Sequence, residues 1–192
     1  EYTFPNVFTR HLDAALLAIN HLKELGHRDI GLVMTEGVTV GSDQENLEGI
    51  VNLGKAMGLN IGGRYNVICG DYRQDLAFEA VKDLLKSSNR PSALYCCDDY
   101  LAMGAVEAAE ELGLDVPGDL SVVGMGNYVP QVNLTTVQTP LAQMGRIAAR
   151  MLAGLVFDTF KGPEHVLVND NSLIRGKTTA PPSVRAKKSI FR

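Results

Sequence analysis

Short apolar runs alternate with amphipathic helical patterns along the first two thirds of the chain. Leucine, isoleucine and alanine repeat at three-to-four spacing over 12–25, which predicts a helix that ends before Gly26. The nearly continuous apolar run 30–34 follows, as is typical of a buried strand. The alternation continues with helix 44–57, strand 65–69, helix 74–85, strand 92–97, helix 99–112 and strand 120–124. This order predicts an α/β fold with a doubly wound parallel sheet, which binds ligands at the carboxyl ends of its strands.

The last third of the chain has a different pattern. An extended segment, 134–140, leads into helix 141–157, whose apolar residues recur on one face. Short strands are predicted at 166–168 and 173–175. Because prolines and basic residues are frequent at the end of the chain, we expect 179–192 to be a solvated tail.

Composition indicates an ordinary globular protein. The chain of 192 residues is 45% hydrophobic and 21% charged, with a formal net charge of −4. A nucleic-acid-binding module would normally be basic, so this chain is not expected to be one by itself. No apolar run approaches the roughly 18 residues of a membrane span, and the first residues lack a signal-peptide pattern. We therefore expect a cytoplasmic protein that makes no contact with membranes.

The cysteines and histidines show no metal-binding pattern. Cys69, Cys96 and Cys97 form neither an even disulfide framework nor a CxxC pair, and they are expected to be small strand residues. A reactive thiol remains the alternative. His27 stands at a predicted helix end, where a cation would be stabilised by the helix dipole. The sequence predicts no metal and no cofactor.

Signals for an enzyme are weak. Gly124 and Gly126 begin like a dinucleotide-binding loop, but Val129 and Pro130 follow where a glycine and a helix would be needed. The phosphate-loop, serine-hydrolase and zincin motifs do not occur in the sequence. An acidic pair follows strand 92–97: Asp99 is the expected N-cap of the next helix, and Asp98 is the better candidate for a ligand contact. No catalytic residue is predicted.

Four segments together resemble the effector-binding core of LacI/GalR-family transcriptional regulators. They are VPGDLSVVG at 116–124, HLKELGHRDI at 21–30, DYLAMGA at 99–105 and LTTV at 134–137, in the order and spacing of the family. The resemblance implies a periplasmic-binding-protein-like fold of type I, with two lobes that close on a small ligand. It also implies an essentially complete C-terminal lobe and a partial N-terminal lobe.

The resemblance implies the following division of the chain. Residues 1–26 would hold the last helix of the N-terminal lobe, 27–133 the C-terminal lobe, 134–160 a return to the N-terminal lobe, 161–178 a return to the C-terminal lobe, and 179–192 the tail. Helices 12–26 and 138–157 would then lack their sheet, which would leave exposed apolar faces. We expect the chain to be a segment of a longer protein.

The resemblance also implies a set of effector-binding residues. Tyr72 matches an aromatic residue that stacks on the ligand, and Asp98 matches a polar position that binds ligand hydroxyl groups. Three charges of the family pattern are absent: Asn46 occupies the position of an arginine, Gly126 that of an aspartate, and Thr9, or Arg10 in an alignment shifted by one residue, that of a second aspartate. Gly126→Asp together with Asn46→Arg is therefore expected to improve sugar binding. Ser42 and Asn127 complete the predicted set.

The resemblance favours the effector-sensing and dimerisation core of a DNA-binding regulator. A sugar or sugar-like effector would control operator affinity through an N-terminal DNA-binding domain that this chain does not contain. Because the missing charges make the site poorly suited to an ordinary pyranose, a different small molecule and a loss of ligand control are also left open. Helices 74–85 and 99–112 are candidate surfaces of a homodimer, although plain core packing explains their alanines equally well. Two alternatives remain: the sugar-binding protein of a transport system, and the same core behind a GntR-type winged-helix head.

Overall fold

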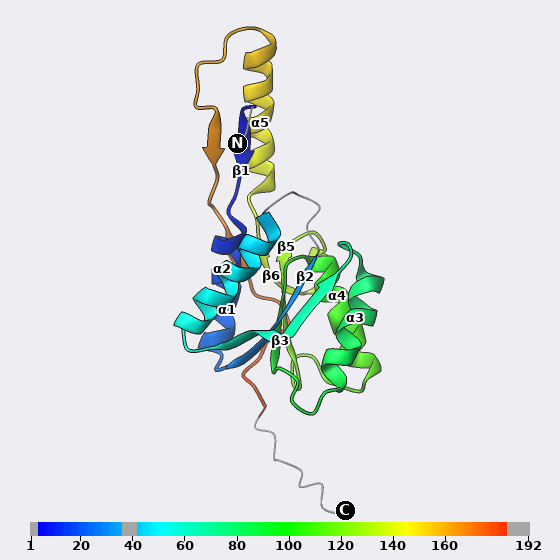
Figure 1. Cartoon of the computed structure of the whole chain (residues 1–192). Helices are drawn as coiled ribbons and strands as arrows, with labels where there is room; N and C mark the ends of the chain where they lie inside the picture. The colour runs from blue at the N-terminus through cyan, green and yellow to red at the C-terminus, as the bar shows by residue number, and fades with distance from the viewer. Residues whose placement is uncertain (1–3, 36–41, 184–192) are drawn as a thin grey trace, which may run out of the picture.

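The computed structural model describes residues 4–35 and 42–183, and it divides them into two parts. The larger part, which we call the body, is a six-stranded sheet with helices α1 to α4. The smaller part, the arm, consists of β1, β7 and α5 and projects from one end of the body (Figure 1). The helices are α1 (His11–Glu24), α2 (Ser42–Ala56), α3 (Gln74–Lys86), α4 (Asp99–Glu111) and α5 (Leu141–Val156), with a 3-10 turn, η1 (Pro130–Val132). The strands are β1 (Asn6–Phe8), β2 (Asp29–Thr35), β3 (Asn60–Cys69), β4 (Ala93–Cys96), β5 (Ser121–Gly126), β6 (Thr135–Gln138), β7 (His165–Leu167) and β8 (Ser172–Ile174).

The sheet of the body confirms the predicted α/β class. Its strand order is β3-β2-β4-β5-β6-β8, and every neighbouring pair is parallel except β6 with β8. Helices α1 and α2 lie on one face and α3 and α4 on the other (Figure 1). The predicted elements agree with the observed ones apart from their ends and from β3, which begins at Asn60 rather than at residue 65. This arrangement brings the carboxyl ends of the parallel strands to one edge of the sheet.

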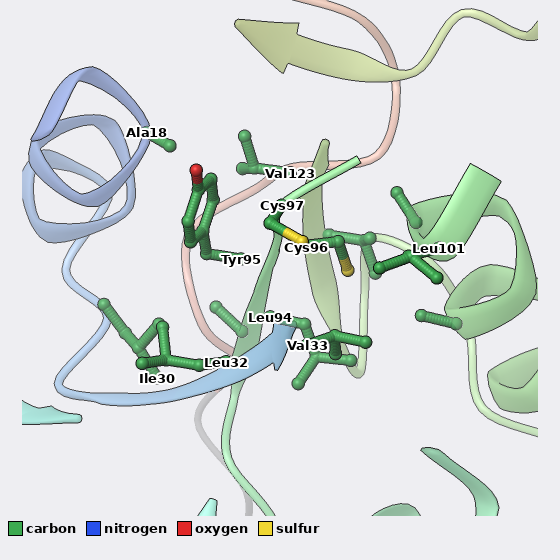
Figure 2. Close-up of a cluster of buried hydrophobic side chains, with 14 of the residues drawn as sticks. Ala18, Ile30, Leu32, Val33, Leu94, Tyr95, Cys96, Cys97, Leu101 and Val123 are labelled. Carbon is green, nitrogen blue, oxygen red and sulfur yellow. The ribbon is translucent and has the colours of Figure 1, made fainter. Parts of the chain in front are cut away.

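The central strands β2, β4 and β5 are buried on both faces because helices cover both. Figure 2 shows Tyr95 of β4 on the side of Ala18 from α1, and Cys96 on the side of Leu101 from α4. All four side chains are buried. This alternation of neighbouring side chains is the pleat of a strand that packs on two layers. The three cysteines are buried. Cys69 and Cys96 are strand residues as predicted, whereas Cys97 lies one residue beyond the end of β4.

Helix α1 corrects one prediction from the sequence. We expected residues 12–26 to be a helix of the other lobe without a sheet to cover it. Instead α1 packs against β4, β5 and β6 of the body and belongs to the same hydrophobic core. Ala14, Ala15 and Ala18 are buried together with Ile19. These small side chains let the helix approach the sheet closely, so its apolar face is covered by the body.

The alanines of α4 also have a clear role. Ala102, Ala105, Ala108 and Ala109 are all fully buried at 0% exposure. Helix α4 packs against α3 and against β5 with this face. The alanines therefore belong to the core of the body, and they do not form a surface for a second copy of the chain.

The arm leaves much apolar surface exposed. β1, which the sequence analysis did not predict, pairs in parallel with β7 and packs against α5. Helix α5 thus has a small sheet beside it, contrary to our expectation, yet Met151 is its one buried residue. Leu152 is 62% exposed and Val156 is 69% exposed. Two strands of three residues each cannot cover the apolar face of a helix this long.

The predicted tail begins later than expected. Thr178 enters the body, where its carbonyl oxygen accepts from the Val122 amide and its Oγ1 donates to the Val122 carbonyl oxygen. Thr179 and Ala180 are held by the side chains of His21 and His27. The prediction of a solvated tail from residue 179 is therefore wrong for these two residues, and 184–192 lie outside the described part.

His27 does not act as a cation at a helix end. It is 1% exposed, and its two ring nitrogens contact the hydroxyl groups of Ser92 and Ser121 and the carbonyl oxygen of Ala180. Burial lowers its pKa, because the charged form loses its hydration. The neutral imidazole is thus the favoured form in the folded protein.

Candidate ligand-binding site

A cavity of about 500 Å³ lies between the body and the arm, at the carboxyl ends of the body strands. It is in the place where open parallel sheets bind their ligands, and its volume suits a small molecule. The body contributes Tyr72 after β3, Cys97 and Asp98 after β4, and Met125 of β5 with Tyr128 after it. His11, the first residue of α1, also comes from the body. The arm and its connections contribute Val7, Phe8, Thr9, Thr139, Leu141 and Met144.

Two tyrosines give the cavity its aromatic surface. Tyr72 is 37% exposed and Tyr128 is 45% exposed. The position of Tyr72 agrees with its predicted contact to a ligand, whereas Tyr128 was not predicted. Burial raises the pKa of Tyr128, and the nearby carboxyl groups of Asp98 and Asp99 raise it further. The Tyr128 phenol is therefore neutral near pH 7. Both tyrosine rings present flat surfaces on which a ring can stack.

Asp98 is the acidic group of the cavity, and it is also the N-cap of α4. Its Oδ1 accepts a hydrogen bond of 2.7 Å from the Tyr100 amide. The prediction that Asp99 is the cap is wrong, because the Asp99 side chain turns into the body and the Asp98 side chain faces the helix end. Burial raises the pKa of Asp98 from 3.8 to about 6, although the bond from Tyr100 opposes this shift. Asp98 therefore changes charge within a mildly acidic range.

Thr9, one of the residues predicted to bind the effector, lies in the connection between β1 and α1 and in the wall of the cavity. Its Oγ1 is buried and makes no hydrogen bond within the described residues. A buried hydroxyl without a partner is unfavourable by about 1–3 kcal/mol. A ligand or an ordered water could satisfy it.

Other predicted residues lie outside the cavity wall. Gly126 has a φ of 126°, a conformation that favours glycine, and a Cβ on it would come within 2.2 Å of the Tyr128 ring. Asn127 donates a hydrogen bond of 3.0 Å to Gln138. Neither residue lines the cavity, while their neighbours Met125 and Tyr128 do.

Ser42 and Asn46 cannot be placed relative to the cavity. Both lie in the first turns of α2, but their side chains are outside the described part of the structure. The roles that the resemblance implies for them stay predictions.

Several residues that line the cavity were not predicted, because the sequence pattern did not reveal the strand or the ligand-facing side of the helix to which they belong. Val7 and Phe8 belong to β1, whose three residues give too short a pattern for recognition. Met144 lies on α5, where we predicted an apolar face and no ligand contact. Tyr128 could have been found, because it follows a strand end that was itself predicted to face the ligand.

The described lining contains no lysine and no arginine. Asp98 is its carboxyl group, and His11 is its imidazole. Within the described residues, no three His, Cys, Asp or Glu side chains are placed to hold a metal ion. The arrangement suits an uncharged or cationic ligand better than an anionic one, since an anion would meet no permanent positive charge.

A second cavity, of about 350 Å³, lies at the amino end of the same sheet. Its charged lining residues are Arg64, Arg90, Asp29 and Asp119, whose formal charges cancel. Asp29 already accepts a hydrogen bond of 2.6 Å from Asn60. The cavity at the carboxyl ends remains the better candidate, because its tyrosine rings are partly exposed, whereas Tyr65 of the second cavity is buried. It also lies between two parts of the molecule.

Comparison with protein families assigns the fold to a known group. Residues 19–179 match the family model described as periplasmic binding protein-like domain. The chain belongs to this family. Within it, the chain is related to the effector-binding domains of LacI-family transcriptional regulators, as the following relatives show.

Known proteins with similar sequences and structures are regulators. The HTH-type transcriptional repressor CytR of Escherichia coli is 30% identical over 191 residues, which cover 95% of this chain and 54% of CytR. A LacI-family regulator from Mycobacterium smegmatis is 28% identical with a TM-score of 0.79, covering 92% of this chain and 66% of that structure. The structure of the regulator CelR in complex with cellobiose is 23% identical in sequence, with a TM-score of 0.79. The match covers 91% of this chain and 54% of CelR, and it shows a shared fold. The chain spans about half the length of the curated relatives that it matches.

These comparisons agree with the assignment to a non-enzymatic regulator domain. The described residues of this periplasmic-binding-protein-like domain also include no helix with the length and hydrophobicity to cross a membrane.

Proposed function

We propose that this domain binds a small effector between the body and the arm, and that the bound effector changes how the two parts are arranged. The observation that supports the proposal is the cavity of about 500 Å³ lined from both parts, with Tyr72 and Asp98 on one side and Phe8 on the other. A ligand that contacts both parts favours the arrangement in which both sets of contacts form. The arrangement would in turn control the affinity for operator DNA.

The chemistry of the lining favours an uncharged, sugar-like effector or a cationic one. Sugar hydroxyl groups can donate to Asp98, and an apolar sugar face or a flat ring can stack on Tyr72. The CelR structure contains cellobiose, which is a neutral sugar. Sugar phosphates and sugar acids are disfavoured, because the described lining offers them no lysine or arginine.

The remaining partners follow from the family. The protein would act in the cytoplasm as a homodimer, and a DNA-binding domain outside this chain would bind the operator. CytR, whose name describes an HTH-type transcriptional repressor, supports this over the transport alternative. A winged-helix head in place of the helix-turn-helix is the second alternative, and the residues next to the chain in its parent protein would distinguish the two.

A thermal-shift screen tests the proposal. The protein is heated with neutral sugars, nucleosides and amines, and with matched sugar phosphates and sugar acids. A ligand at about a hundred times its dissociation constant adds roughly 2.7 kcal/mol, which raises the midpoint of unfolding by about 5–10 °C. We expect such a shift from at least one uncharged or cationic compound. Shifts from anionic compounds alone would contradict the proposed effector class, and no shift at all would contradict effector binding.

A further inference from the structure

Asp99 makes hydrogen bonds that join three segments of the body. It is 0% exposed, and it is the first residue of α4. Its Oδ2 accepts a bond of 2.7 Å from the Tyr128 amide, in the connection after β5. Its Oδ1 accepts a bond of 2.6 Å from Thr136 Oγ1, on β6. One buried carboxylate thus connects the start of α4 to the cavity wall and to β6.

The space for this carboxylate comes from a glycine. A Cβ at Gly124 would lie 2.4 Å from Asp99 Oδ1. Any larger residue there would push the carboxylate away from Thr136 and Tyr128. The side chain therefore occupies one defined position against the sheet.

The backbone around Tyr128 needs such an anchor. Asn127 before it has a φ of 61°, and Asn133 at the end of the same connection has a φ of 55°. Both values lie in the left-handed region, which residues other than glycine adopt uncommonly. The Tyr128 ring lies over Gly126, within 2.2 Å of where a Cβ would be. The hydrogen bond that the Tyr128 amide donates to Asp99 fixes this connection at the residue whose ring lines the cavity.

We propose that Asp99 is the positioning residue of the ligand cavity. Its carboxylate holds Tyr128 in the cavity wall and joins that wall to β6, the strand that leads to α5 of the arm. Asp99 itself does not line the cavity, so it acts through Tyr128 and Thr136. The proposal rests on the proposed function, because it gives one wall of the effector cavity a direct connection to the crossover into the arm.

Amide hydrogen exchange, followed by NMR on the labelled protein without any ligand, tests this proposal. In Asp99→Ala the Tyr128 amide is expected to exchange at least about tenfold faster relative to the core amides of Leu94 and Val122. In Asp99→Asn the protection is expected to return, because the amide oxygen can accept from Tyr128 and its NH₂ group can donate to Thr136. If Asp99→Ala does not fold, Asp99→Ser replaces it, since its short hydroxyl cannot reach both partners.

Two controls separate positioning from a general loss of stability. Wild-type protein in dilute urea is matched to the variant in global stability, and the Tyr128 amide should keep its relative protection there. Asp115→Ala removes a comparable bond, from the Gly118 amide to the Asp115 carboxylate, at a turn far from the cavity. This variant should leave the exchange rate of the Tyr128 amide unchanged. The proposal is overturned if the Tyr128 amide stays protected from exchange in Asp99→Ala. It is also overturned if the exchange rates of the core amides and of the Tyr128 amide rise by the same factor.

The exchange result is independent of the effector screen. If the Tyr128 amide of Asp99→Ala exchanges at the wild-type rate and the variant still binds the effector, only the positioning role of Asp99 is overturned. An absent effector response would overturn the proposed function and leave the measurement at Tyr128 interpretable.

Discussion

The imidazole Nε2 of His27 lies 2.9 Å from the carbonyl oxygen of Ala180. His27 follows α1 near the start of the chain, whereas Ala180 belongs to the segment that returns from the arm. Ser121 connects the same two residues, since its Oγ contacts both His27 Nε2 and Ala180. Together with His21 and Thr179, this contact fixes the returning segment to the body.

The buried histidines predict that the domain loses stability in mild acid. Burial lowers the pKa of both His21 and His27 in the folded state. The unfolded chain then binds more protons as the pH falls through its histidine pKa of about 6.5, so stability is present above that pH and declines below it. Urea unfolding at pH 7.5 and pH 5.5 measures this decline. His27→Gln should show a smaller decline than the wild type, and an equal decline would contradict the role of His27.

Asp98 predicts the opposite pH dependence. Its folded pKa of about 6 lies above the usual aspartate value of 3.8, so the folded state binds more protons between these two values. Stability therefore falls as the pH rises through them. Asn caps a helix about as well as Asp and stays neutral. Asp98→Asn should therefore gain stability over the wild type at pH 7.5, by about 1–3 kcal/mol more than at pH 4. Urea unfolding at both values measures the difference.

The matching control for Asp98 is an exposed acid. Asp83→Asn, at a position whose side chain is 90% exposed, should show no comparable pH-dependent gain. An equal gain in both variants would show that the effect comes from net charge rather than from the burial of Asp98.

Much of the body could be predicted from the sequence, because each of its strands and helices has a strong apolar pattern of its own. The two-stranded sheet of the arm could not be predicted, because β1 has only three residues and its partner β7 is more than 150 residues away in the sequence. Helix α1 was correctly predicted as a helix, but its alanines did not reveal which sheet they would contact. The helix cap was predicted at Asp99 instead of Asp98, because neighbouring carboxyl groups at a helix start are equivalent in sequence. The hydrogen-bond partners of Asp99, which are Tyr128 and Thr136, come from other elements.

Tyr72 predicts a specific loss of ligand affinity. Replacing it with alanine removes an aromatic face from the cavity and no part of the core, because the side chain is 37% exposed. We expect Tyr72→Ala to weaken the binding of a ligand identified in the screen by about tenfold or more, as measured by titration calorimetry. Tyr100→Ala provides a control, since Tyr100 is 44% exposed and does not line the cavity. Equal affinities of wild type and Tyr72→Ala would remove Tyr72 from the site.

The backbone at Gly126 predicts that Gly126→Asp destabilises the domain, whereas the family resemblance predicted that this substitution, together with Asn46→Arg, improves sugar binding. An aspartate there must adopt a φ near 126° and avoid the Tyr128 ring. Such a backbone conformation is unfavourable by about 1–3 kcal/mol for residues other than glycine. We expect Gly126→Asp to destabilise the domain and displace Tyr128, with or without Asn46→Arg, as seen in urea unfolding and NMR. Improved sugar binding by the double variant would show that the backbone at Gly126 adapts.

The central claim is that the effector binds between the body and the arm, at the carboxyl ends of the strands. The most direct measurement is an NMR titration of the labelled protein with the strongest compound from the thermal-shift screen. If the effector binds between the body and the arm, the largest changes in amide chemical shift will occur at Tyr72, Asp98, Met125 and Tyr128. Changes centred instead on Arg64, Arg90 and Asp119, at the amino end of the sheet, would contradict it.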